Sequence, residues 1–320
     1  MPLDHLYDRV SRVIPRLEWT TMEDDVRAIL ELKKLRNAVI LAHNYQTPEI
    51  FHGVSDIVGD SLALAREAQK IDAGIILIAG VNFMAETVKL LNPEKTVLIP
   101  DTDAGCSLAE SITPDDVALL RQKYPGRPVV AYVNTSAAVK AMCDICCTSG
   151  NAKKIVESLG VPEVIMLPDE FLALNIAKET HVKIIAWKGH FEVHERFTAD
   201  DIVNLRVQHP GVIVLTHPEC PPEVVEMADF SGSTAVMADF VRDRKPARVA
   251  LITECSMSDN IAQSNPGTDF IKPCNLCPHM KRITLKNIRK SLQELKTEVL
   301  IESKYFEPAR RAVERMLAAK

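Results

Sequence analysis

Short apolar runs alternate with longer amphipathic stretches along most of this chain. The runs are continuous and rich in valine and isoleucine, which is typical of parallel strands buried on both faces. Nine such runs predict strands in three groups, at 39–42, 75–79 and 96–99, at 129–131, 164–167 and 182–186, and at 212–215, 249–252 and 270–271. Helical patterns separate the last two runs of each group, at 84–91, 171–180 and 256–263. This order predicts three βαβαβ units with short parallel sheets.

The three groups also share polar positions at fixed spacings. In each, an aspartate is followed five residues later by a hydroxyl, giving the pairs Asp56 and Ser61, Asp144 and Ser149, and Asp229 and Thr234. Beyond the last run, 50, 47 and 48 residues after those aspartates, lie Cys106, Phe191 and Cys277. Repetition at a fixed period indicates a repeated structural unit.

We therefore predict an α/β protein of three Rossmann-like domains related by a pseudo-threefold axis. The expected boundaries are 22–112, 113–199 and 200–282, followed by C-terminal helices within 283–320. The closing helices are amphipathic and are expected to pack on the outside of the first or third unit.

Polar residues follow the first predicted strand of every unit. They are His43, Tyr45, Tyr132, Asn134, His217 and Glu219. Ligands of parallel α/β units bind beyond the carboxyl ends of the strands. The hydroxyls of Ser61, Ser149 and Thr234 precede helical patterns and suit N-caps, where free N–H groups hold anions. If the units converge on the axis, all of these groups face one central cleft.

The amino-acid composition limits the classes of partner that the protein is expected to bind. The net charge is −5, with 38 basic and 43 acidic residues and no cluster of lysine or arginine, so we expect no nucleic-acid partner. The apolar runs are too short to span a bilayer, and the first ten residues do not have the pattern of a signal peptide. We therefore expect a cytoplasmic protein without a membrane partner.

Eight cysteines in a cytoplasmic chain are more often ligands or bystanders than a disulfide framework. Cys274 and Cys277 form a CxxC motif, which could join Cys143 and Cys146 in a zinc site. The repeat argues against that pairing, because Cys146 and Cys147 align with the turn before the hydroxyl. Cys274 is interpreted either as a spare thiol or as a disulfide partner of Cys277. For Cys255 we expect a structural role, and Cys220 is a candidate to line the cleft.

Cys106 and Cys277 occupy equivalent ends of two units, which makes them a candidate ligand pair. Three cysteines from three equivalent loops would hold three irons of a [4Fe–4S] cluster and leave the fourth iron open as a Lewis acid. The third equivalent position is Phe191.

Nine ordered motifs between residues 37 and 282 resemble those of the quinolinate synthases, iron–sulfur enzymes of de novo NAD biosynthesis. The motifs are Ala42 to Gln46, Gly59 to Ser61, Asn82 to Glu86, Ala131 to Thr135, Cys147 to Ser149, Glu192 to His194, His217 to Cys220, Gly232 to Thr234 and Cys277 to Met280. The resemblance implies a transferase-class synthase that condenses iminosuccinate with dihydroxyacetone phosphate and loses phosphate and two waters. It also implies a functional link to the enzyme that supplies iminosuccinate.

The same resemblance implies a role for each cleft residue. The groups that hold the dicarboxylate or the phosphate would be His43, Ser61, Tyr132, Asn134, Ser149, His217, Glu219 and Thr234. Tyr45 and Glu219 would transfer protons, with His194 nearby, and the cluster would bind Cys106 and Cys277. Taken singly, such a histidine or serine is more often structural. For His194 both interpretations stay open, and for His190 and His209 a structural or solvent-exposed role is favoured.

The chain departs from the family at Phe191, where the family has its third cluster cysteine. Phenylalanine cannot bind iron, so we expect weak or absent retention of a [4Fe–4S] cluster and reduced activity unless His190, Cys220 or a small molecule supplies the bond. Two alternatives remain. One is a cluster-less anion-binding paralogue, and the other is a zinc-stabilised α/β protein.

Overall fold

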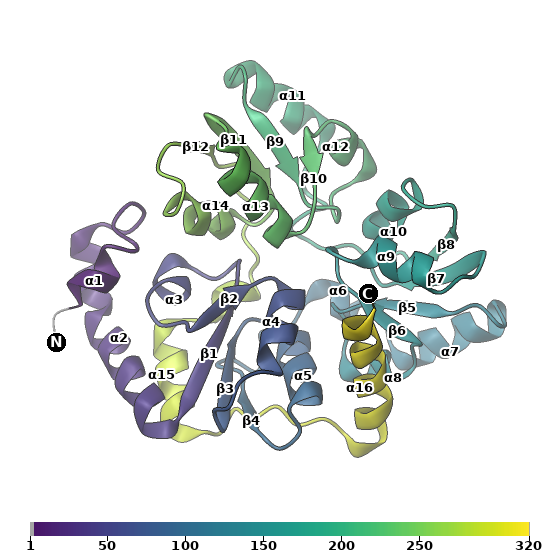
Figure 1. Ribbon diagram of the computed structural model, residues 1–320, viewed down its shortest axis with the longest axis horizontal. Coiled ribbons are helices and arrows are strands. Elements are labelled where there is room, and N and C mark those ends of the chain that lie inside the picture. The colour runs from purple at the N-terminus through teal and green to yellow at the C-terminus, as the bar shows by residue number, and fades with distance from the viewer. Residues whose placement is uncertain (1–2, 320) are drawn as a thin grey trace.

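The computed structural model describes residues 3–319. It contains three separate sheets, each of four parallel strands. Met1, Pro2 and Lys320, at the ends of the expected lead-in and closing segments, lie outside it. Figure 1 shows the sheets arranged around a common centre, coloured purple to blue, teal and green in chain order. The predicted fold class is confirmed, and each sheet falls within one of the three expected ranges.

The strands follow one order in all three sheets, with the first strand in the interior. The first sheet has the order β2-β1-β3-β4, with β1 (Ala38–His43), β2 (Ile57–Gly59), β3 (Ile75–Ala79) and β4 (Thr96–Leu98). The second has β6-β5-β7-β8, with β5 (Val129–Tyr132), β6 (Ile145–Cys147), β7 (Glu163–Leu167) and β8 (Lys183–Ala186). The third has β10-β9-β11-β12, with β9 (Ile213–Thr216), β10 (Phe230–Ser231), β11 (Arg248–Ile252) and β12 (Asp269–Ile271).

One strand of each sheet was not predicted. The sequence analysis expected a turn before each hydroxyl, at Cys146 and Cys147 in the second unit, whereas these segments form the edge strands β2, β6 and β10. These strands are only two or three residues long, too short for an apolar run to mark them. They matter for the site because the hydroxyls five residues after the aspartates follow them directly.

Helices connect the strands of each unit. In the first unit and its lead-in they are α1 (Asp4–Tyr7), α2 (Arg16–Arg36), α3 (Pro48–Phe51), α4 (Ser61–Ala68), α5 (Asn82–Leu91) and α6 (Ser107–Glu110). The second unit has α7 (Pro114–Lys123), α8 (Ala137–Ala141), α9 (Ala152–Ser158) and α10 (Glu170–Ala177). The third has α11 (Ala199–Gln208), α12 (Pro222–Glu226), α13 (Thr234–Arg244) and α14 (Cys255–Ala262), and a 3₁₀ turn at Met280–Arg282 precedes the closing helices.

The repeated aspartate fastens the start of each unit. Its Oδ2 atom accepts the backbone N–H of a residue in or next to the first strand, at 2.8, 2.7 and 2.7 Å from Ile40, Val129 and Val214. A basic residue 23 positions earlier completes each contact, through the pairs Lys33 and Asp56, Arg121 and Asp144, and Arg206 and Asp229. The aspartates therefore hold the helix that precedes the first strand of each unit against that strand, and they do not line the pocket.

The helix caps differ from the prediction. The N-caps of α4, α9 and α13 are Asp60, Asn151 and Ser233. Ser61 and Thr234 are instead the first residues of α4 and α13, and Ser149 precedes the cap of α9. Because the preceding side chains take the capping role at α4 and α13, the hydroxyls of Ser61 and Thr234 are not used as caps and face the cleft.

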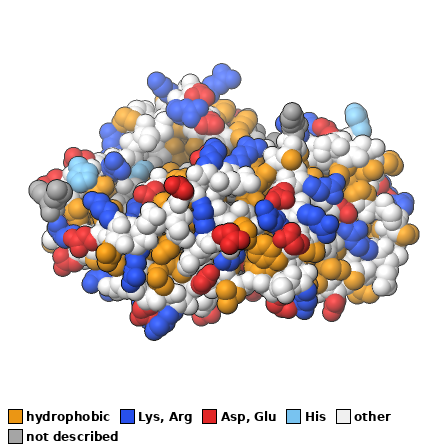
Figure 2. Space-filling model, turned by 60° about the horizontal axis from the view of Figure 1, so that its bottom comes forward, with side chains coloured by type: hydrophobic (Ala, Val, Ile, Leu, Met, Phe, Trp, Pro, Cys, Tyr) orange, Lys and Arg blue, Asp and Glu red, His pale blue; other side chains and the backbone are white. Residues whose placement is uncertain are grey.

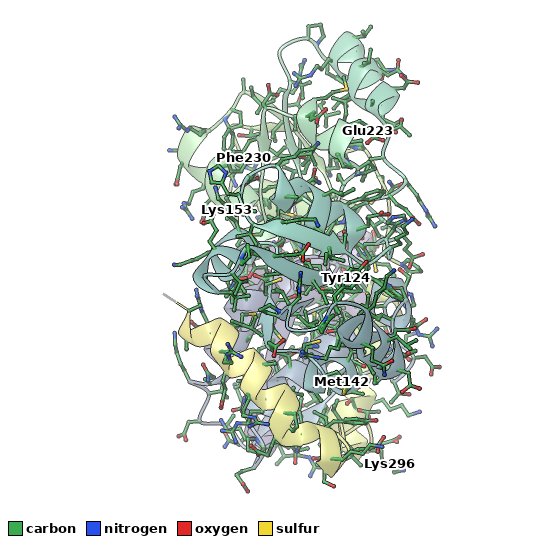
Figure 3. The ribbon with its side chains drawn as sticks, turned by 90° about the vertical axis from the view of Figure 1, so that its right-hand side faces the viewer. Tyr124, Met142, Lys153, Glu223, Phe230 and Lys296 are labelled. Carbon is green, nitrogen blue, oxygen red and sulfur yellow. A yellow bond between two sulfur atoms is a disulfide. The ribbon has the colours of Figure 1, made fainter. Side chains whose placement is uncertain are left out.

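The closing helices pack on the first and second units. Helix α15 (Leu285–Glu294) lies against α2, as expected for the first unit. Helix α16 (Ser303–Ala318) lies against α8, β6 and α5, so it joins the second unit to the first. The expectation that this helix packs on the first or third unit is therefore wrong for its main contact, which is with the second unit. Figure 3 shows it crossing the molecule near Met142, which follows α8.

The surface agrees with the composition. On the face shown in Figure 2, basic and acidic side chains are interspersed, and no uniform basic patch covers it. Among the described residues, every helix is either too short or too polar to cross a lipid bilayer.

Candidate active site

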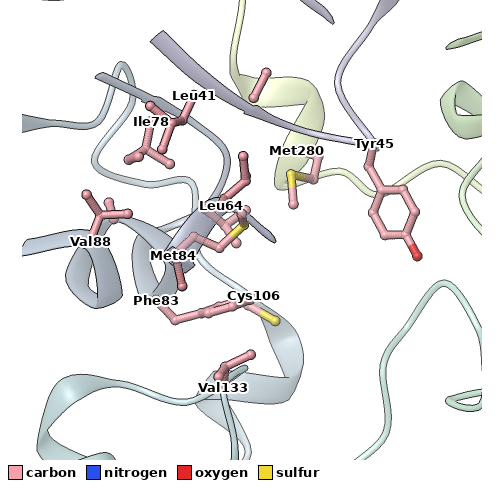
Figure 4. Close-up of a cluster of buried hydrophobic side chains, with 14 of the residues drawn as sticks. Leu41, Tyr45, Leu64, Ile78, Phe83, Met84, Val88, Cys106, Val133 and Met280 are labelled. Atoms are coloured by element: carbon pink, nitrogen blue, oxygen red, sulfur yellow. The ribbon is translucent and has the colours of Figure 1, made fainter. Parts of the chain in front are cut away.

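The carboxyl ends of the three sheets meet at one pocket of about 570 Å³ of empty space. Cys106, Phe191 and Cys277, the ends of the three units, all line it. So do most of the predicted polar residues, namely His43, Tyr45, Ser61, Tyr132, Asn134, Ser149, His217, Glu219 and Thr234. Figure 4 shows Cys106, Tyr45 and Met280 arriving from different segments. The repeat therefore led from sequence spacing to a shared site.

His43 and His217 occupy equivalent positions and share one backbone contact. The Nδ1 atom of each accepts the N–H two residues ahead, from Tyr45 at 3.2 Å and from Glu219 at 3.3 Å. For His43 the remaining proton is therefore placed on Nε2. For His217, Nε2 lies 3.1 Å from Ser149 Oγ, across the boundary between the second and third units. Burial lowers the pKa of His43 to about 3, so its imidazole is a neutral donor.

Glu219, which lines the pocket, forms a buried pair with His194, which does not. His194 Nδ1 lies 2.6 Å from Glu219 Oε2, and neither side chain is appreciably exposed. Burial lowers the pKa of His194 to about 4. Burial alone would raise the pKa of Glu219, but His217 and His194 outweigh it and hold that pKa below its ordinary value. A carboxylate beside a neutral imidazole is thus the state at neutral pH.

Tyr45 is linked to this pair through Thr253, a residue outside the nine family motifs. Its hydroxyl lies 2.7 Å from Thr253 Oγ1, and His194 Nε2 lies 2.9 Å from the same oxygen. Burial, and next Glu219, raise the pKa of Tyr45 well above its ordinary value, so the phenol is protonated. All three predicted proton-transfer residues therefore belong to one hydrogen-bonded chain, although His194 does not line the pocket itself.

His194, His217 and Glu219 are also the one group found among residues 3–319 that brings three metal-ligating atoms together. Two donors bound to one zinc ion at tetrahedral angles lie about 3.3 Å apart. The 2.6 Å between His194 Nδ1 and Glu219 Oε2 is shorter and fits a charge-assisted hydrogen bond. These two atoms therefore lie closer together than two ligands of one zinc ion would.

Buried amides hold the loops that carry these residues. Asn260 of α14 donates from Nδ2 to the carbonyls of Asn44 and Gln46, at 3.0 and 2.8 Å. Asn175 of α10 donates in the same way to Pro218 and Cys220, at 2.9 and 3.0 Å. Each asparagine lies 31 residues after its repeated aspartate and grips the loop of the next unit.

The first unit breaks this rule, because the equivalent residue is Thr87, which bonds Phe83 within its own helix. The loop of the second unit is held instead by Lys140, whose ammonium group donates to the carbonyls of Val133 and Thr135. Lys140 is fully buried, and burial lowers its pKa. In the second unit, a lysine thus holds the loop that carries Asn134, where an asparagine amide holds the loops of the other two units.

The remaining cysteines lie elsewhere. Cys274 forms a disulfide with Cys255, so both earlier interpretations of Cys274 were wrong. This bond leaves Cys274 without a free thiolate, which the zinc alternative requires. Cys143 and Cys146 sit beside α8 and in β6, and neither lines the pocket. The backbones of Glu254 and Asn275 pair, which brings their neighbours Cys255 and Cys274 together, and no sequence spacing marks this contact.

Comparison with known proteins identifies the family. The model of the quinolinate synthetase A protein family matches residues 27–318. The chain belongs to the quinolinate synthase family. A quinolinate synthase of Agrobacterium fabrum is 72% identical over 98% of this chain and 90% of its own length. One from Xylella fastidiosa is 71% identical over 92% and 87%, and one from Caulobacter vibrioides is 57% identical over 98% and 86%.

Enzymes of the quinolinate synthase family generally depend on an iron–sulfur cluster, and the pocket fits that group only in part. Cys106 and Cys277 offer two thiols to one cavity, and burial raises their pKa to about 12 and about 11. Phe191 fills the third position, is buried, and packs its ring 5.1 Å from that of His194. The residues present do not make the three-cysteine set that the resemblance implies.

Neither expected substitute reaches the pocket. His190 Nε2 lies 2.8 Å from Glu170 Oε2, and its ring stacks on Phe171. Cys220 is buried with its thiol 3.5 Å from the carbonyl of Ile252. Neither residue lines the cavity. His209 is the C-cap residue of α11 and does not line the cavity either, so a structural or solvent-exposed role stays the favoured interpretation of His190 and His209.

Proposed function

We propose that this protein makes quinolinate from iminosuccinate and dihydroxyacetone phosphate, with loss of phosphate and two waters. The observation that carries the proposal is the meeting of all three unit ends and nine polar family positions at one pocket. Family membership supports the same reaction. The enzyme that supplies iminosuccinate would be its functional partner.

The pocket suits small anions through hydrogen-bond donors that are not lysine or arginine side chains. No lysine or arginine is among the described residues that line it, and the donors are imidazoles, hydroxyls and an amide. Ser61 and Thr234 begin α4 and α13, so the free N–H groups of these helices add to the hydroxyls. We assign the dicarboxylate and the phosphate to the donors of this set, which are His43, Ser61, Tyr132, Asn134, Ser149, His217 and Thr234. Glu219 lines the pocket beside them as an ionised acceptor.

Proton transfer falls to Tyr45 and Glu219, with His194 between them. Two dehydrations need protons taken from one atom and delivered to a leaving hydroxyl. Glu219 is ionised and accepts protons, whereas Tyr45 is protonated and donates them. We derive no step through the cluster, because Phe191 leaves it with two protein ligands.

We propose further that Phe191 lowers the activity by weakening cluster retention. The test measures quinolinate formed under anaerobic conditions by the original chain and by Phe191→Cys, each reconstituted with iron and sulfide. We expect quinolinate from the variant and far less from the original chain. A variant that binds a dicarboxylate tightly but forms no quinolinate would instead favour the anion-binding alternative.

A further inference from the structure

The loop after the first strand of each unit differs in the second unit. The strand pairings align two sets of loop residues, which are His43, Tyr132 and His217, and two positions later Tyr45, Asn134 and Glu219. In the first and third units, the histidine Nδ1 atom accepts the N–H of the later residue, at 3.2 and 3.3 Å. Tyr132 has no ring nitrogen to accept the N–H of Asn134. Within residues 3–319, neither this N–H nor the side-chain amide of Asn134 has a hydrogen-bond partner.

The carbonyl side of the same peptide is bound by a lysine. In the first and third units, neutral asparagine amides bind the equivalent carbonyls. In the second unit, the Nζ atom of Lys140 donates to the carbonyl of Val133 at 2.8 Å and to that of Thr135. The Val133 carbonyl and the Asn134 N–H belong to one trans peptide, so they point in opposite directions. The N–H of Asn134 therefore points away from Lys140.

Lys140 places its charged group close to the pocket without lining it. Its side chain is fully buried, and its Nζ atom lies 5.7 Å from the ring centre of Phe83, which does line the pocket. Two carbonyls and an aromatic face suit the three donors of an ammonium group. The carboxyl group of Glu86 is within electrostatic reach of Lys140, and burial raises the pKa of Glu86. Burial thus disfavours the ionised form that would oppose the lysine charge.

We propose that the backbone N–H of Asn134 binds an oxyanion of the substrate and that Lys140 is the positioning residue that charges this contact. The inference rests on the proposed function, because it adds a donor to the same pocket. A carbonyl that accepts from an ammonium group polarises its peptide, which makes the N–H on the other side a stronger donor. The pocket thereby gains the effect of a cation, although no lysine or arginine is among the described residues that line it.

The charge is tested with Lys140→Gln, whose neutral amide can still hold both carbonyls, as the asparagines do in the other units. Calorimetric titration with malate and with inorganic phosphate compares this variant with the original chain and requires no turnover. We expect about tenfold weaker binding of one anion or both, and the anion affected identifies the substrate group as carboxylate or phosphate. Lys153→Gln removes an exposed lysine of α9 and should change neither affinity, because solvent screens its charge. Unchanged binding of both anions in Lys140→Gln would overturn the proposal.

A second measurement observes the N–H itself in the original chain. Labelling valine carbonyls with carbon-13 and asparagine amides with nitrogen-15 selects the Val–Asn peptides for NMR, which lie at 81–82, 133–134 and 203–204. The Asn134 proton should move downfield when malate or phosphate is added, and it should move less in Lys140→Gln. Loss of the signal in Asn134→Asp assigns it, and Asn204, exposed on α11, should keep its position. An Asn134 signal that neither anion moves would overturn the anion contact.

The anion contact and the proposed reaction fail separately. An Asn134 signal that responds to anions, with no quinolinate from Phe191→Cys, would count against the reaction alone. Quinolinate from Phe191→Cys, with an Asn134 signal that no anion moves, would count against the contact alone. Should Lys140→Gln not fold, the NMR titration of the original chain still decides between these outcomes.

Discussion

Buried, neutral imidazoles define the site at the scale of single residues. Burial lowers the pKa of His43 to about 3 and that of His194 to about 4, from 6.5. Both imidazoles are neutral in the folded protein, whereas in the unfolded chain they take up a proton near pH 6.5. The contribution of each neutral imidazole to folding stability is therefore complete above pH 6.5. It is lost as the pH falls from 6.5 toward the pKa values in the folded protein, about 3 for His43 and about 4 for His194.

This linkage predicts an acid-sensitive fold. For His43, lowering the pH from 7 to 5 should cost about 2 kcal/mol of unfolding free energy. His43→Gln should remove that part of the pH dependence, while His181→Gln, a change at an exposed histidine, should leave it intact. Urea unfolding at both pH values measures the difference. An unchanged pH dependence in His43→Gln would contradict the burial of a neutral imidazole.

The sequence predicted most site residues but not their partners. His43, Glu219 and Tyr45 carried the family motifs and lie at or just beyond the carboxyl ends of strands, so their place could be expected. Thr253 could not, because a threonine after a strand has no distinctive spacing and its role depends on two side chains from other segments. Phe191 was predicted at the end of the second unit because the repeat itself marks that position.

At the scale of elements, the loops of the site are held by helices of the preceding units. Asn260 on α14 donates to the loop of the first unit, and Asn175 on α10 donates to that of the third. Their common offset from the aspartates was present in the sequence. It could not be recognised without the fold, because the contact joins different units and the first unit has Thr87 instead.

We expect Asn260→Leu to loosen the loop that carries His43 and Tyr45. The change removes two donors to buried carbonyls and should cost about 2 kcal/mol of stability. Affinity for a dicarboxylate should fall with it. Asn265→Leu is the matched control, since Asn265 bonds only within its own helix end. Thermal unfolding and calorimetric titration with malate measure both effects. Equal effects of the two variants would show that the loop contact is unimportant.

At the scale of the whole molecule, three repeated units share one site, and α15 and α16 close the outside. Continuous apolar runs and the repeat predicted the three sheets and their convergence. The edge strands were missed because they are too short to carry a pattern. The position of α16 and the disulfide of Cys255 depend on contacts between distant segments, which a single sequence does not encode locally.

The disulfide makes a prediction about the third unit. Cys255 and Cys274 are 19 residues apart, so reduction should lower the free energy of unfolding by about 3 kcal/mol through the entropy of the unfolded chain. Dithiothreitol should produce this loss in the original chain and have no effect on Cys255→Ser. Denaturant unfolding with and without reductant measures it. A loss of the same size in Cys255→Ser would assign the effect to another thiol.

The central claim is that this is a quinolinate synthase scaffold with one cluster ligand replaced. Iron counting tests it most directly, on the original chain and Phe191→Cys reconstituted side by side without oxygen. About four irons per chain should remain on the variant after desalting, as in a [4Fe–4S] cluster, and far fewer on the original. Four irons held equally firmly by both chains would contradict the account.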